Sequence, residues 1–201
     1  MLPPITRLLL TLSGIVAGVG PATAQTSLRL SAGATIGSAL VRDELGGPVT
    51  LRPGAAPTVA IAASHSVGHG YRIALEGQFG SSSLKVTDNG SKDDLGALRT
   101  LGMLLLLDGP IAKSLRWQAG AGALLYRPAV RQGVFLENSP TRWLLAAGAD
   151  WSRPVGKTLA LVLTARYDFS TFTTRRLDTI GYSQFTAVQR VGLFVGLERR
   201  F

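Results

Sequence analysis

The chain contains no cysteine among its 201 residues and only two histidines. The lack of cysteine excludes disulfides, thiolate metal sites and thiol catalysis. Long apolar runs are also missing, because the longest one beyond the amino terminus covers only 101–107. A membrane helix needs roughly 20 such residues. Yet 46% of the residues are hydrophobic. A chain this apolar without a spanning helix favours a closed barrel, since in lipid only helices and closed sheets satisfy every backbone polar group.

Acidic residues are scarce, with 12 against 21 basic ones, for a formal net charge of +9. Basic charge can indicate nucleic-acid binding, but the amino terminus argues for export instead. Arg7 precedes an apolar stretch at 8–18, and Ala22-Thr23-Ala24 resembles a cleavage site. This pattern predicts a cleaved signal peptide at 1–24 and a mature domain at 25–201. An uncleaved anchor is the weaker alternative, because the apolar stretch is short.

Eight segments show the period-two alternation of β-strands. They lie near 27–37, 57–65, 70–80, 98–107, 114–126, 142–151, 158–170 and 187–201. Short connections at 66–69, 108–113 and 152–157 alternate with longer ones at 38–56, 81–97, 127–141 and 171–186. Short periplasmic turns and longer extracellular loops are typical of outer-membrane barrels. We therefore predict an all-β fold, an eight-stranded antiparallel up-and-down transmembrane β-barrel with both termini on the periplasmic side.

The two faces of these segments differ sharply in charge. On one face Arg199 is the only formal charge, and His65 is the only residue that can acquire one. Aromatic residues lie near both ends of this face, as expected for the two interfaces of a membrane. The other face combines charges with many small residues. Because an eight-stranded interior is narrow and filled by side chains, we expect this second face to point inward.

The last strand carries a motif. The sequence Val195-Gly196-Leu197-Glu198-Arg199-Arg200-Phe201 resembles the closing strand of small outer-membrane barrels of the OmpA/OmpX type. The resemblance implies a Gram-negative outer membrane, and recognition by the barrel-assembly machinery through Gly196, Leu197 and Phe201. It also implies that the last strand pairs with 27–37 to close the sheet.

The inward face carries ionisable side chains that need partners, because burying an unpaired charge is costly. We expect an interior charge network formed by Glu76, Arg166, Asp168, Arg190, Arg116 and Asp150. A salt-bridged plug is the favoured interpretation, since an eight-stranded lumen is usually too narrow for a channel. A small ion-selective pore is the alternative.

Candidate catalytic groups are few. His65 and His69 could ligate a metal or act as a base, but they fall in a predicted periplasmic turn with no acidic cluster beside them. The segment 81–97 is rich in serine and aspartate but lacks the spacing of a calcium-binding EF-hand, so we predict a polar loop. No catalytic, metal or cofactor site is expected.

These observations favour a non-enzymatic protein with a structural, adhesive or surface-interaction role. A narrow, porin-like pore or a carrier for small solutes is the alternative, and a lipid A-modifying enzyme is the third possibility. The expected partners are outer-membrane lipids and lipopolysaccharide, with the barrel-assembly machinery during biogenesis and no nucleic acid. No feature indicates an oligomeric state.

Overall fold

The computed structural model describes residues 25–43, 49–88, 91–129, 140–173 and 186–201. The predicted signal peptide at 1–24 lies outside these ranges. The described regular elements are all strands, and they run in chain order as follows: β1 (Thr26–Gly37), β2 (Val41–Asp43), β3 (Val49–Pro53), β4 (Ala56–Gly68), β5 (Tyr71–Asp88), β6 (Ser91–Ala112), β7 (Leu115–Pro128), β8 (Thr141–Pro154), β9 (Leu159–Phe172) and β10 (Thr186–Arg200). No helix in the described ranges is long and apolar enough to cross a membrane.

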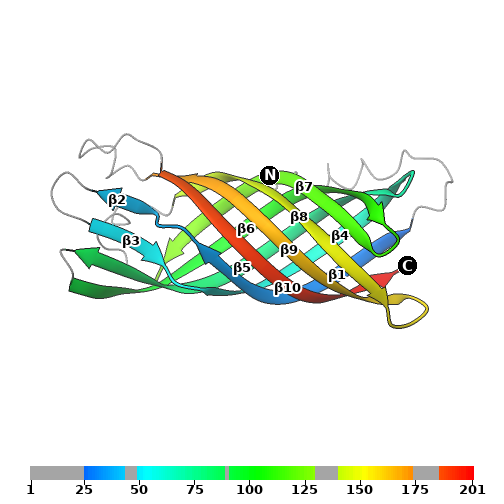
Figure 1. The fold of residues 1–201 in the computed structure, drawn as a ribbon, viewed down its shortest axis with the longest axis horizontal. Coiled ribbons are helices and arrows are strands. Elements are labelled where there is room, and N and C mark those ends of the chain that lie inside the picture. Colours follow the sequence, from blue (N-terminus) through cyan, green and yellow to red (C-terminus); the bar gives the residue numbers. More distant parts are fainter. Residues whose placement is uncertain (1–24, 44–48, 89–90, 130–139, 174–185) are drawn as a thin grey trace, which may run out of the picture.

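Eight of these strands close into a ring (Figure 1). Following the hydrogen bonds, the ring order is β1, β10, β9, β8, β7, β6, β5 and β4, and every pair is antiparallel. The last strand pairs with the first from Arg190 to Arg200, with Leu30 opposite Leu197. The predicted eight-stranded antiparallel barrel is therefore confirmed, including its closure by the carboxyl-terminal strand.

Successive side chains along each strand point to opposite faces of the sheet, and the apolar ones point outward. Leu30 and Leu193 are each 65% exposed on the outer face, whereas Leu104 on the inner face is fully buried. Arg29, Glu76 and other charged side chains are buried inside. This arrangement is inverted relative to a soluble barrel. It suits a lipid-facing wall around a narrow polar lumen.

The two ends of the barrel differ. At one end, hereafter the turn end, strands join through tight connections at 69–70, 113–114 and 155–158. The carboxyl terminus lies at this end (Figure 1). The opposite end, hereafter the loop end, carries β2, β3 and the far ends of β5 and β6. The predicted alternation of short and long connections thus matches the described turns.

Two of the predicted long loops contain strands, which corrects the sequence interpretation. The segment 38–56 holds β2 and β3, and most of 81–97 belongs to β5 and β6. The β5–β6 ladder continues as far as Asp88 opposite Ser91, and β3 adds to β5 with Leu51 opposite Val86. Leu51 and Leu84 are nearly fully buried there. The burial of these two leucines accounts for the apolar residues that alternate with polar ones after the serine-rich stretch 81–83. The other two predicted loops lie mostly outside the described residues.

The barrel wall is interrupted between β1 and β4. Their ladder ends with Thr35 opposite Ala56, and the β2–β3 ladder begins only at Val41 opposite Leu51. Residues 36–40 and 52–55 lie between, without pairing to each other in either ladder; we call this interruption the wall gap. Pro53 has no backbone N–H to offer a ladder. The amide of Gly54 donates instead to the Ser83 carbonyl of β5, at 2.8 Å.

Candidate functional site

A continuous chain of ion pairs, the central network, crosses the lumen. It runs through side chains of alternating charge, namely Asp150, Arg29, Glu76, Arg166, Asp168 and Arg190. Arg29 contacts Asp150 at 2.6 Å and Glu76 at 3.4 Å. Arg166 pairs with both Glu76 and Asp168. Three positive and three negative charges balance one another. Buried charges persist only when they are paired in this way.

Neutral polar groups complete the central network. Thr164 and Gln118 donate to the Asp150 carboxylate at 2.6 and 3.2 Å, and Arg166 donates to the Gln78 side-chain oxygen at 2.6 Å. The Arg166 guanidinium also stacks over the ring of Phe194, 5.0 Å from the ring centroid. The lumen at this level is filled by side chains that hold each other in place.

A second cluster, the turn-end network, lies nearer the turn end. Arg72 bridges Asp108 at 3.0 Å and Glu198 at 2.9 Å. Arg116 contacts Asp108 at 2.5 Å, and Arg200 contacts Glu198 at 3.2 Å. These side chains come from β5, β6, β7 and β10, so they tie together half of the ring.

An apolar plug fills the lumen on the loop-end side of the central network. Its members are exposed by no more than 2%, and they are Leu40, Leu98, Leu104, Leu124, Tyr126, Leu144, Phe172 and Val188. Tyr126 and Phe172 meet edge to face with ring centroids 5.3 Å apart. The Tyr126 hydroxyl lies 3.4 Å from that of Ser170. The plug and the two networks therefore fill the lumen with described side chains at successive levels along the axis.

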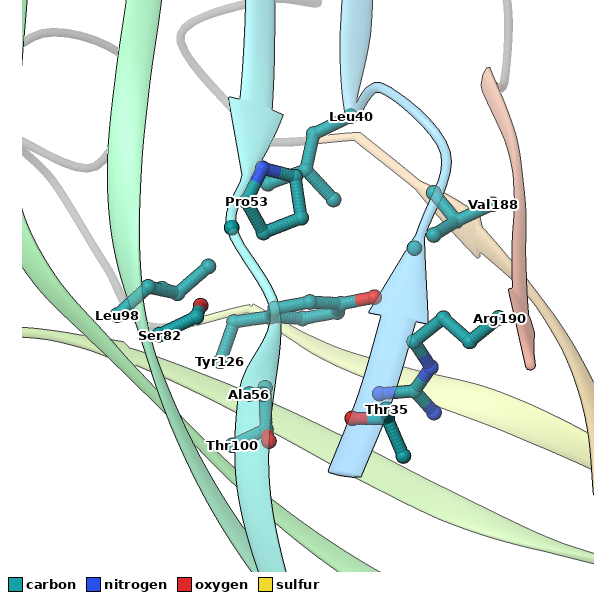
Figure 2. Close-up of a pocket in the computed structure, with 12 residues that line it drawn as sticks. Thr35, Leu40, Pro53, Ala56, Ser82, Leu98, Thr100, Tyr126, Val188 and Arg190 are labelled. Atoms are coloured by element: carbon teal, nitrogen blue, oxygen red, sulfur yellow. The ribbon is translucent and has the colours of Figure 1, made fainter. Parts of the chain in front are cut away.

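A small cavity lies where the apolar plug meets the wall gap (Figure 2). It measures about 20 Å³, of the order of the space that a buried water needs. Its apolar lining includes Leu40, Leu98 and Tyr126, and Arg190 is the one charged residue among the described residues that line it. Figure 2 shows the Arg190 guanidinium directed toward Thr35 beside β1, with the Tyr126 ring between Leu98 and Arg190 in this view. The cavity therefore combines one cation with apolar walls.

The structure brings together five of the six residues predicted for the interior charge network. Arg116 is the exception, because it belongs to the turn-end network. Arg29 is a member of the central network that the predicted set of six lacks, although the alternation places it on the inward face of the first strand. The predicted connection at 108–113 includes Asp108 and the turn-like Gly109-Pro110. The strand in fact continues to Ala112, with a register irregularity after Pro110.

Comparison of the sequence with protein-family models and with curated proteins finds no match. Solved structures do match. The outer-membrane protein OprG from Pseudomonas aeruginosa superposes with a TM-score of 0.62 over 89% of this chain and 96% of its own, at 9% identity. AlkL, an outer-membrane protein, gives 0.53 over 92% of both chains at 16% identity. Neisserial surface protein A gives 0.52 over 89% and 99% at 15% identity.

The fold is that of small bacterial outer-membrane β-barrels. The outer-membrane barrel fold accounts for the belt of exposed apolar side chains, because lipid covers that face. Tyr71 and Trp117 meet edge to face near the turn end, with centroids 6.3 Å apart, and Trp143 and Phe169 meet nearer the loop end at 5.5 Å. Two aromatic groups near the two interfaces match the predicted girdles.

The two histidines of this outer-membrane barrel lie at a turn. His69 has a φ of 50° between Gly68 and Gly70, both also at positive φ, so the segment is a tight reversal. His65 lies on β4, where its Nδ1 is 3.4 Å from the Thr26 hydroxyl. Within the described ranges, no group of three or more His, Asp or Glu side chains is arranged to hold a metal ion.

Proposed function

We propose that the chain is a non-conducting barrel of the bacterial outer membrane that presents a folded sheet at the cell surface for interaction. The observation that carries this proposal is the four-stranded sheet β2-β3-β5-β6 at the loop end. β5 has 18 residues and β6 has 22, whereas the other ring strands have 12–15. The extra length extends the sheet past the rest of the ring (Figure 1).

The lumen filled by side chains supports a structural role rather than a transport one. The apolar plug, the central network and the turn-end network follow one another along the axis, and each is made of mutually paired or packed side chains. Ions that crossed would have to break buried ion pairs, which is expensive. We therefore place the function on the outside of the barrel, with no enzymatic step.

The protruding sheet offers a mixed-charge surface for contact. Arg52 faces Lys85, and Lys85 faces Asp94, so three charged side chains form one cross-strand row. All three are exposed. An open hollow of about 530 Å³ lies beside them, lined in part by Pro57, Asp94 and Gly96. A polar, ordered surface of this kind suits contact with a partner better than contact with lipid.

Two further partners belong to the proposal. Lipopolysaccharide and other outer-membrane lipids would surround the apolar wall, with phosphates near basic residues of the loop end such as Arg52. The barrel-assembly machinery would bind the last strand through Gly196, Leu197 and Phe201 before closure. Leu197 is 49% and Phe201 67% exposed, so both side chains are accessible for such recognition.

Adherence of whole cells tests the surface role. Cells that display the wild type are expected to adhere to glass and to immobilised collagen several-fold better than cells that lack the protein. The double variant R52Q/K85Q should lose most of this difference. The matched control R153Q/K157Q removes two charges at the turn end instead and should adhere like the wild type. Equal adherence of cells with and without the protein would refute the proposed surface role.

The wall gap favours a second candidate, a carrier for small solutes. An interrupted ladder and a cavity behind it provide a place where a small molecule could enter the wall without crossing the sealed axis. Proteoliposome uptake of small solutes that differ in polarity tests this candidate. Uptake no faster than in protein-free liposomes would exclude it.

A further inference from the structure

The cavity at the wall gap is lined by an arginine with donors that make no hydrogen bond. Arg190 lines it, and the side chain of this arginine is only 11% exposed. Its Nε and Nη2 atoms are both buried and make no hydrogen bond. Buried polar groups are normally hydrogen-bonded, and each exception asks for an explanation. Two unused donors on one guanidinium beside a cavity indicate a missing acceptor.

The geometry of the unused donors restricts what the acceptor can be. The Nε–H and one N–H of Nη2 point in parallel from the same edge of a planar guanidinium, which matches the two oxygens of a carboxylate. Among the described residues, the carboxylate paired with Arg190 is that of Asp168, which comes within 3.5 Å of Nη2 without forming a hydrogen bond. Asp168 is shared with Arg166, whose Nε is closer at 3.0 Å. Arg190 is thus only partly compensated.

The charges around the cavity favour an anion over a cation. Within the central network the charges cancel, with Arg190 as its terminal member. Arg142 lies nearer the loop end, and its Nε is likewise buried without a hydrogen-bond partner. Its guanidinium donates to the backbone carbonyls of Thr141 and Thr173. The described part of the chain offers Arg142 no carboxylate, so Arg142 adds a positive charge that no described carboxylate balances.

We propose that this cavity binds a small monocarboxylate with an apolar tail. The carboxylate accepts two hydrogen bonds from the Nε–Nη2 edge of Arg190. The tail lies against Leu40, Leu98 and Val188 and extends into the wall gap. This binding site goes beyond the surface role proposed above and does not depend on it.

The wall gap supplies both the access and the space. The ligand-free cavity holds about 20 Å³, less than a carboxylate with its tail, so binding requires the gap to widen. Residues 36–40 and 52–55 are not paired across the gap, so no direct ladder between them has to break. Gly37 keeps the space open, because a Cβ there would lie 3.2 Å from Arg190 Cγ and 3.7 Å from Pro53 Cγ.

Calorimetric titration of the protein in phosphatidylcholine nanodiscs tests the proposal, with octanoate, octanol and octyltrimethylammonium as probes and empty nanodiscs as the background. Octanoate should bind saturably and at least tenfold more tightly than octanol, and the cation should show no saturable binding.

R190Q should weaken octanoate binding at least tenfold. G37V removes no ionisable group but fills the space beside the Arg190 side chain, and it should also weaken binding severalfold. R153Q, at the turn end, should bind octanoate like the wild type.

Three results would overturn the proposal. One is the absence of saturable octanoate binding to the wild type. A second is octanol binding as tight as octanoate binding. The third is unchanged octanoate binding in R190Q, or in G37V if R190Q does not fold as judged by heat-modifiable migration. The adherence of R190Q cells separates this site from the surface role, because adherence should stay at the wild-type level.

Discussion

Glu76 and Arg166 pair across the full width of the barrel. Glu76 projects from β5 and Arg166 from β9, and three strands separate β5 from β9 in either direction around the ring. Both side chains are almost completely buried, with 3% and 2% of their surface exposed. One ion pair therefore joins diametrically opposite walls. The remaining members of the central network extend this cross-link to β1, β8 and β10.

Replacing Glu76 with glutamine should destabilise the barrel strongly. The amide cannot neutralise Arg166 and Arg29, so both guanidinium groups lose a buried counter-charge. Removing one partner of a buried pair costs about 3–5 kcal/mol. Urea unfolding of the refolded protein in detergent, followed by tryptophan fluorescence, measures the change.

The matched control for that experiment is D93N, which removes an acidic charge from the exposed part of β6. Surface substitutions of this kind change stability by less than about 0.5 kcal/mol. If E76Q unfolds at the same urea concentration as D93N, the central network does not stabilise the fold. The double variant E76L/R166L replaces this charged pair with two apolar side chains. The double variant should be more stable than E76Q, because it leaves neither member of the Glu76–Arg166 pair as an unpaired buried charge.

The narrow interior should not tolerate a side chain at Gly122. This glycine lies on the inner face of β7, opposite Leu104 and Leu144. A Cβ there would collide with the backbone carbonyl of Met103. We expect G122A to cost about 1–3 kcal/mol, as overpacking does.

Gly77 provides the comparison for G122A. It faces outward on β5, and the nearest atom to an added Cβ would be Ile61 Cγ2 at 3.9 Å. G77A should therefore leave the unfolding midpoint unchanged or raise it slightly. If G122A and G77A destabilised the protein equally, the narrow lumen would not be the reason for a glycine at position 122.

Phe201 should matter for assembly in the cell more than for stability. Its backbone N–H donates to the Thr26 carbonyl at 2.9 Å, a bond that any residue can make, while its ring is exposed beside Arg199. F201A should lower the amount of heat-modifiable barrel in the outer-membrane fraction several-fold. The same variant refolded in detergent should unfold within about 0.5 kcal/mol of the wild type. If F201A lowered the stability of the refolded protein in detergent but left the amount of barrel in the outer-membrane fraction unchanged, the assembly role would be contradicted.

The ring and its sidedness could be predicted because alternation is a local property of the sequence. Each strand shows its own inward and outward faces, and the terminal strands had to pair if the sheet was to close. The partners of each buried charge could not be predicted in the same way. That Glu76 meets both Arg166 and Arg29 depends on the tilt and stagger of the strands, which no single strand encodes.

The wall gap and the protruding sheet were missed for a different reason. Ser81-Ser82-Ser83 and Pro53-Gly54 have the composition of loops, and the alternation beyond them covers only a few residues. Tertiary pairing decides the outcome there, since β3 can form only because β5 continues alongside it. The buried Leu51 and Leu84 were the available signal, but two apolar residues within a polar segment do not define a strand.

Single-channel recording of the refolded wild type in planar bilayers tests the sealed lumen most directly. If the apolar plug and the two ionic networks close the axis, insertion of the protein should produce no conductance steps above the bilayer background. Insertion would be verified in the same preparation by heat-modifiable migration and protease protection. Regular, ion-selective steps from the wild type would contradict the account and identify the barrel as a pore.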